Sequence, residues 1–110
     1  MNKRHLVLVL TEPTEGQEAE FNNYYENTHL EEVLETTDFS SAQRFKLVGE
    51  AGEGAPLPYL AVYETEAPDA QSVLDNLSAN RGKREQSDAL NRRTGRVWVF
   101  EELGPKHERS

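Results

Sequence analysis

The chain has 110 residues, no cysteine and a formal net charge of −8, because 20 Asp and Glu outnumber 12 Lys and Arg. Such an acidic chain repels a phosphate backbone, and without thiols it has neither disulfides nor Cys-ligated metals, so we expect no nucleic-acid partner and no metal site. Its longest apolar run, LVLVL, is far shorter than the roughly 20 residues that cross a bilayer. We therefore expect one soluble cytoplasmic domain that does not bind membranes.

The first predicted elements are a strand and a helix. The apolar run at 5–11 predicts a buried strand that ends in the turn sequence EPTEG. Thr14 is expected to cap a helix that begins near Glu15, because Gln17 follows at the spacing of a capping box. Glu15 and Glu18 would then lie where the helix dipole favours negative charge.

One face of this helix carries an unusual set of aromatic and polar side chains. Phe21, Tyr25 and His29 are four residues apart, so all three lie on the same side of an α-helix. Leu30 and Leu34 fall about 100° away from that side when each residue turns the helix by about 100°. We therefore expect the helix to bend or break near His29, which would turn a second apolar edge inward.

The rest of the chain reads as three more strands and one more helix. Alternating or apolar runs predict the strands, and Pro68 and Asp69 open the helix. In chain order we expect a strand at 38–49, a mobile Gly-rich loop at 49–58, a strand at 59–65, a helix at 67–80, a polar segment at 81–95 with a short helical turn at 86–92, and a strand at 96–103.

This order, β-α-β-β-α-β, predicts a ferredoxin-like α+β domain over residues 1–104, followed by a solvated tail at 105–110. In this fold both helices cover one face of a four-stranded antiparallel sheet. Both faces of the strands are largely apolar, so we expect a second copy of the chain to cover the other face. Alternation leaves open which residues face which way: Leu6, Leu8 and Leu10 or His5, Val7 and Val9; Leu60 and Val62 or Tyr59, Ala61 and Tyr63; Trp98 and Phe100 or Val97 and Val99.

Three segments resemble the EthD-like group of dimeric α+β barrel proteins: FNNYYENTHLEEVL (21–34), DFSSAQRFKL (38–47) and the closing aromatic strand RVWVFEEL. The first helix of that group carries a Phe-Asn-x-aromatic-Tyr-x-x-x-His pattern. The resemblance implies that two ferredoxin-like subunits pack sheet to sheet, each with a pocket between its helices and its sheet. This chain has Tyr24 where relatives often have Trp, and Glu31 where they often have Pro.

Six side chains are candidates for a small-molecule site. His29 and Tyr25 are the catalytic candidates, because an imidazole titrates near neutral pH and a phenol donates to a carbonyl. Each candidate also has a purely structural explanation: a satisfied helix-end His, core or rim aromatics, an Asn on the exposed helix surface, an ion pair between the mid-strand Arg and a helix carboxylate, and a core or interface Trp. The candidates for contact with substrate are Asn22, Tyr24, Arg44 and Trp98.

The leading functional hypothesis rests on the family resemblance. It is a small cofactor-independent enzyme of the isomerase, cyclase, dehydratase or lyase type, which acts by proton transfer on a hydrophobic cyclic or aromatic carbonyl compound. The alternative is a non-catalytic homodimer that binds such a small molecule. A third possibility, haem bound through His29, is disfavoured because few Arg or Lys surround that residue in sequence to pair with an anionic cofactor.

Overall fold

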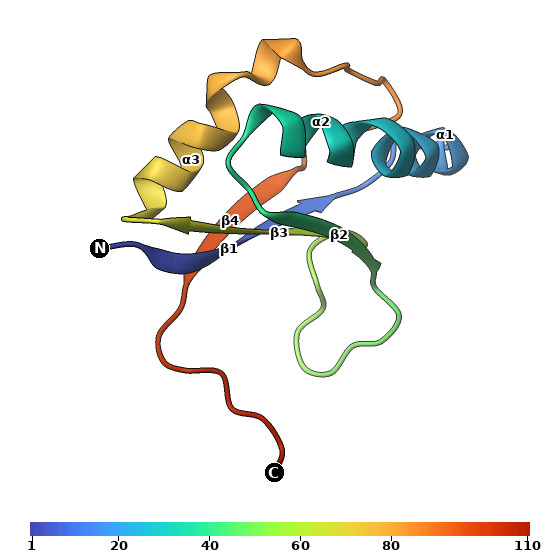
Figure 1. Ribbon diagram of the computed structural model, residues 1–110. Helices are drawn as coiled ribbons and strands as arrows, with labels where there is room; N and C mark the ends of the chain where they lie inside the picture. The colour runs from blue at the N-terminus through green and yellow to red at the C-terminus, as the bar shows by residue number, and fades with distance from the viewer.

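The computed structural model describes all 110 residues and confirms the β-α-β-β-α-β order and the ferredoxin-like fold (Figure 1). Its antiparallel sheet has the strand order β2-β3-β1-β4. A π-helical turn, Tyr25–His29, joins α1 to α2, so that these two form a single interrupted helix. The elements are β1 (Lys3–Thr11), α1 (Glu18–Tyr24), α2 (Leu30–Thr36), β2 (Ser41–Lys46), β3 (Tyr59–Ala67), α3 (Ala70–Ala79) and β4 (Arg96–Glu101).

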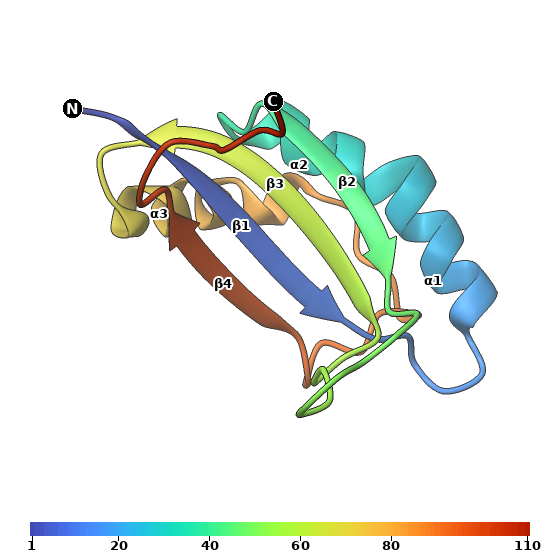
Figure 2. The same ribbon diagram turned by 90° about the horizontal axis from the view of Figure 1, so that it is seen from below.

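The molecule has two layers, with every helix on the same side of the sheet (Figure 1). Figure 2 looks at the sheet from the opposite side, where no helix lies in front of the strands. The loop between β2 and β3 and the tail after β4 both project on this open side (Figure 1). None of the helices combines the length and the apolar character that crossing a bilayer requires.

The strand register decides the alternation that the sequence leaves open. Val7 pairs with Tyr63 of β3 and with Val99 of β4. Val7 and Tyr63 are fully buried against the helices. Because neighbouring residues of a strand point to opposite faces, Leu8 and its partner Trp98 lie on the open face. The helix side therefore carries His5, Val7, Val9, Tyr59, Ala61, Tyr63, Val97 and Val99, and the open side carries Leu6, Leu8, Leu10, Leu60, Val62, Trp98 and Phe100.

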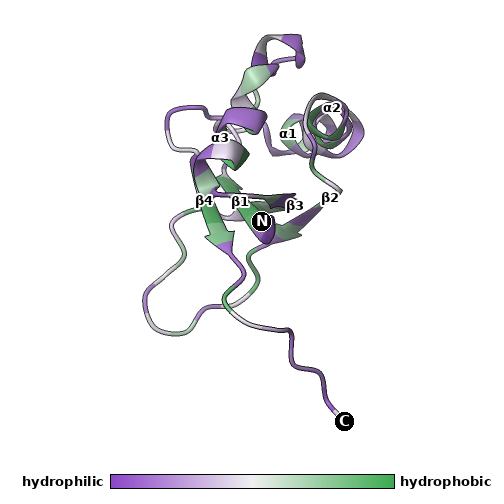
Figure 3. Ribbon diagram, turned by 60° about the vertical axis from the view of Figure 1, so that its left-hand side comes forward, coloured by the Kyte–Doolittle hydropathy of each residue, from purple (hydrophilic) through white to green (hydrophobic).

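The core lies between the sheet and the helical layer. Phe21 and Tyr25 contact each other with ring centroids 5.3 Å apart, and both are buried, as the helical spacing predicts. Val33 and Val73 bring α2 and α3 into the same cluster as Tyr63. The outer sides of the helices are hydrophilic, whereas β4 is hydrophobic along most of its length (Figure 3).

The expected break near His29 is the π-helical turn. A π turn contains one more residue than an α turn, so the residues after it are rotated by about 100° relative to an uninterrupted helix. This rotation brings Leu30 onto the buried side, where it is 9 % exposed, and keeps Val33 there at 1 %. The helix thus buries both apolar edges in succession.

Several predicted boundaries are wrong, and the first is the start of the first helix. It begins at Glu18, with Gln17 at the N-cap position, rather than near Glu15. Thr14 does not cap it, because its hydroxyl donates to the carbonyl oxygen of Asp88 at 2.6 Å. Gly16, with φ 79°, makes the turn that precedes the helix.

The helical turn predicted at 86–92 is also absent. The backbone of this segment bonds to the loop after β1 instead: Ala89 accepts from the Thr14 amide at 2.6 Å, and Leu90 forms a bridge with Pro13. These long-range bonds take the place of helical ones. A short 3₁₀ turn forms at Arg81–Lys83, directly after α3, and β2 is shorter than the strand predicted at 38–49.

Candidate functional site

A cavity of about 890 Å³ lies on the helix side of the sheet. Its volume falls in the range of roughly 300–1,000 Å³ that is typical of small-molecule sites. Residues of α2, α3, the segment 81–95 and the strands β1 and β4 form its walls, and Tyr24 and His29 reach it from the first helix. Its apolar lining consists of Val9, Val33, Leu74, Leu77, Leu90 and Val97, together with the ring of Tyr24 and that of Tyr63.

His29 is held at the wall of this cavity by Tyr24. Their rings stack with centroids 5.2 Å apart, and the Tyr24 hydroxyl lies 3.0 Å from Nδ1 of His29. The same hydroxyl donates its single proton to the carbonyl oxygen of Glu85 at 2.9 Å, because a carbonyl can only accept. Nδ1 of His29 must therefore carry a proton and donate it to Tyr24. Nε2 is left as an unprotonated acceptor with no hydrogen-bond partner in the chain.

The surroundings of His29 keep it neutral at pH 7. Burial, and secondly the positive charge of Arg84, lower the pKa of His29 to about 4, against an opposing effect of the Glu32 carboxylate. Burial also raises the pKa of the Tyr24 phenol to about 12, so Tyr24 keeps its proton. The pair is a neutral phenol and a neutral imidazole with a fixed tautomer.

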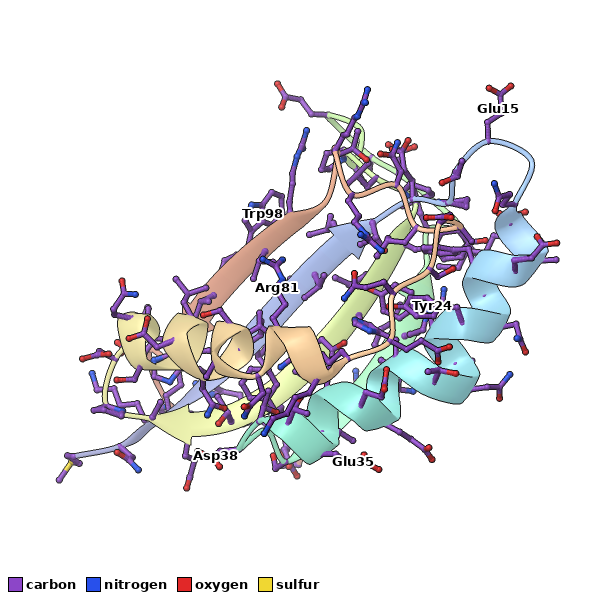
Figure 4. All side chains as sticks on the ribbon, turned by 90° about the horizontal axis from the view of Figure 1, so that it is seen from above. Glu15, Tyr24, Glu35, Asp38, Arg81 and Trp98 are labelled. Atoms are coloured by element: carbon purple, nitrogen blue, oxygen red, sulfur yellow. The ribbon has the colours of Figure 1, made fainter.

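Arg84 is the most deeply buried charge of the site, with 7 % of its surface exposed. Its Nε donates to the Thr36 hydroxyl at 2.8 Å, whereas its Nη2 is buried without a hydrogen-bond partner. Burial lowers the pKa of the Arg84 guanidinium, and the nearby charge of Arg81 acts in the same direction. Figure 4 shows Tyr24 and Arg81 on the helix side of the sheet, reaching from α1 and from the end of α3.

The structure does not bring all six predicted site residues together. Tyr24 and His29 line the large cavity. Tyr25 lies behind them, is 2 % exposed and does not line the cavity. The edge of its ring contacts His29, with the ring centroids 4.8 Å apart. Burial raises the pKa of the Tyr25 phenol.

Arg44 and Asn22 lie at a second, shallower hollow of about 300 Å³ beside β2. The guanidinium of Arg44 is 3.1 Å from a carboxylate oxygen of Glu26 and donates to Asn22 Oδ1 at 2.7 Å. It also covers the ring of Tyr25, 4.9 Å from the centroid. Arg44 thus forms an ion pair with a helix carboxylate, which is the structural explanation given for this residue from the sequence.

Trp98 lies on the open face of the sheet, across from the cavity, and is 42 % exposed. It is therefore separated from His29 by the sheet itself. Figure 4 shows Trp98 at β4, apart from Tyr24. The core explanation for Trp98 is thus wrong.

The arginines after α3 are a part of the site that the sequence pattern did not indicate. Residues 81–96 hold six of the 12 Lys and Arg of the chain, and four of these six border the cavity: Arg81, Arg84, Arg92 and Arg96. Arg96 pairs with Leu10, so its side chain lies on the open face and only the other three present their charge on the helix side. The signal was present as a local excess of cations in a chain of net charge −8. Without the fold, however, a charged segment is usually just solvated surface.

Fold and cavity together define a class: a ferredoxin-like α+β domain with a small-molecule-sized cavity between its helices and its sheet. Comparison of the chain with protein-family models, with curated protein sequences and with solved structures gives no match. The comparisons therefore add no family to this class, and a fold by itself does not specify a reaction.

Proposed function

We propose that the chain is a small cofactor-independent enzyme of the isomerase, cyclase, dehydratase or lyase type, acting on a hydrophobic cyclic or aromatic carbonyl compound. The observation that carries this proposal is the hydrogen bond of His29 Nδ1 to Tyr24, which leaves the Nε2 lone pair free at a cavity wall. A general base needs such a lone pair within reach of the substrate. The apolar part of the lining favours a ligand with a hydrophobic portion, and the resemblance of residues 21–34 to EthD-like proteins supports the same class of chemistry.

In the proposed reaction, Nε2 of His29 removes a proton from the carbon next to the carbonyl. The electron pair of the broken C–H bond moves toward the carbonyl oxygen, and His29 becomes an imidazolium. The proton then returns to another carbon in an isomerisation, or to a departing oxygen in a dehydration. Tyr24 acts as a positioning residue, because its hydroxyl proton is engaged with Glu85 and its oxygen holds Nδ1.

The test uses solvent-deuterium exchange, which detects proton removal without knowledge of the natural substrate. 2-Tetralone is a suitable probe because it is a hydrophobic cyclic ketone with acidic protons next to its carbonyl. We expect the protein to accelerate exchange in D₂O and His29→Gln to lower the rate by roughly 10²–10⁴-fold, the range for a lost general base. His107→Gln, in the exposed tail, is the control. Equal rates for the wild type and His29→Gln would contradict the proposal.

The alternative, a non-catalytic small-molecule-binding dimer, is favoured by one specific observation. A base works best when its pKa lies near the working pH, and the pKa of His29 is lowered to about 4. A site that only holds a carbonyl compound needs no strong base. In that case 2-tetralone would bind with no accelerated exchange, and His29→Gln would change affinity alone.

We also propose that the functional unit is a homodimer formed through the open face of the sheet. Phe45, Trp98 and Phe100 are 47 %, 42 % and 53 % exposed there, although they lie in regular strands. A contiguous apolar sheet face of this kind is uncommon on a monomer. The EthD-like resemblance implies the same sheet-to-sheet pairing.

A further inference from the structure

The charge of the cavity is opposite to the charge of the chain. Three arginines line it, Arg81, Arg84 and Arg92, against a single carboxylate, Asp75. The whole chain has 12 basic residues and 20 acidic ones, so a random wall would hold more acids than bases. None of the three arginines is within ion-pair distance of a carboxylate, because all five ion pairs of the chain involve other residues.

Arg84 is the most deeply buried arginine of this group, and its side chain is held in place by a hydrogen bond. It is more than nine-tenths buried, Thr36 fixes its Nε, and its Nη2 has no partner. Glu32, whose negative charge raises the pKa of Arg84, makes no ion pair with it, and its Oε1 accepts from the backbone amide of Glu85 at 2.8 Å. An unpaired buried charge is costly, so a guanidinium held in this way is expected to serve a bound anion.

We propose that Arg84 is the anchor of an anion subsite in the large cavity, and that the ligand is a hydrophobic molecule with one carboxylate group. This inference rests on the proposed function only in taking the cavity as the ligand site. Arg81, on the adjoining 3₁₀ turn, adds a second positive charge at the same end of the segment. Arg92 lies close enough to Tyr24 for its charge to lower the pKa of that phenol.

A carboxylate fits this subsite better than a phosphate does. One buried guanidinium neutralises one negative charge, and its planar fork matches the two oxygens of a carboxylate. A phosphate dianion would bring a second charge into a cavity whose lining includes Val9, Val33, Leu77 and Leu90. The apolar walls instead suit the hydrocarbon part of an organic acid.

The experiment compares benzoate with its neutral isostere benzamide and with inorganic phosphate, by isothermal titration or by NMR shift perturbation on the full chain. We expect benzoate to bind roughly tenfold or more tightly than benzamide, and phosphate to bind more weakly than benzoate, because a charge-assisted bond contributes about that factor. Arg84→Met should remove the preference for benzoate. Arg93→Gln, an exposed arginine that does not line the cavity, is the matched control and should keep it.

A second variant covers the case in which Arg84→Met fails to fold after losing its bond to Thr36. Arg81→Gln changes an exposed side chain and should weaken benzoate binding a few-fold while leaving benzamide unaffected. Equal affinity for benzoate and benzamide in the wild type, or tighter binding of phosphate, would overturn the proposal. His29→Gln separates the two hypotheses, because it should slow proton exchange on 2-tetralone by roughly 10²–10⁴-fold and still bind benzoate.

Discussion

The hydroxyl of Tyr24 decides which ring nitrogen of His29 carries the proton. Tyr24 has a single proton, and the carbonyl of Glu85 takes it. His29 must then donate from Nδ1, and its Nε2 is free to accept. The helix contributes the phenol and the imidazole, and the segment after α3 contributes the carbonyl. The tautomer of His29 therefore depends on two parts of the chain that are far apart in sequence.

At the same scale, His29 should make the stability of the protein depend on pH. Its pKa is lowered from the usual 6.5 to about 4 in the folded chain, mainly by burial. As the pH falls from 6.5 to about 4, the unfolded chain gains a proton at His29 and the folded chain does not, so the free energy of unfolding falls. The loss is at most about 3 kcal/mol, because each pKa unit corresponds to about 1.4 kcal/mol.

Urea unfolding at pH 7 and at pH 4 measures this effect. His29→Gln should lose less stability over this range than the wild type does, because it removes the group that titrates. His107→Gln, which changes an exposed His in the tail, should behave as the wild type. Identical pH dependence of all three proteins would mean that His29 is not held neutral by the fold.

At the scale of elements, the π-helical turn Tyr25–His29 aligns two apolar edges of one helix with one core. Phe21 and Tyr24 are buried before it, and Leu30 and Val33 are buried after it. Such turns are frequent at functional sites, and this one ends at His29. The same extra residue thus completes the core and presents the imidazole at the cavity.

Deleting Asn27 from the π turn should let it relax to α-helical geometry. The deletion removes the one residue that the π turn has in excess of an α turn, so Leu30 and Val33 keep their orientation toward the core. We expect the free energy of unfolding to change by no more than about 1 kcal/mol, measured as a nearly unchanged urea midpoint. Asn27→Ala is the control, because it also removes the bond of Asn27 to Asn23 and keeps the length of the turn. A deletion variant less stable than Asn27→Ala by about 3 kcal/mol or more would show that the π turn itself, and not only the orientation of the residues after it, holds the core together.

For the whole molecule, the main question is what covers the open face of the sheet. The helices cover one side only (Figure 2), and the other presents the outward residues of all four strands. The β2–β3 loop and the C-terminal tail project on this open side (Figure 1), where they would flank a second copy. The proposed dimer would remove this face from water and close the two sheets against each other.

Phe100→Lys places a charge on this face and should dissociate the proposed dimer. Phe100 is 53 % exposed in one chain, whereas Val99 points to the helices and would test core packing instead. Sedimentation at micromolar concentration should give a dimer for the wild type and a monomer or an unfolded chain for the variant, since a buried charge opposes association. Ala19→Lys, on the exposed side of α1, is the control and should remain dimeric. A monomeric wild type would contradict the proposal.

The sequence by itself determined the fold class and the inward face of the first helix. Strand and helix periods are local properties, and the run Phe21, Tyr25, His29 needs only the α-helical repeat to lie on one side. The break near His29 followed from the same arithmetic. What alternation could not decide was the face of each strand, because both sets of residues in 5–11 are apolar.

Only the tertiary structure decided the composition of the site. Arg84 meets the Tyr24 and His29 pair because the segment 81–95 folds back across the first helix, held by Thr14 and Glu32 through bonds between residues more than 50 positions apart. No local pattern encodes such contacts. The same is true of Arg44 and Trp98, whose neighbours are set by strand pairing: Arg44 reaches a carboxylate of the first helix, and Trp98 lies on the face that no helix covers.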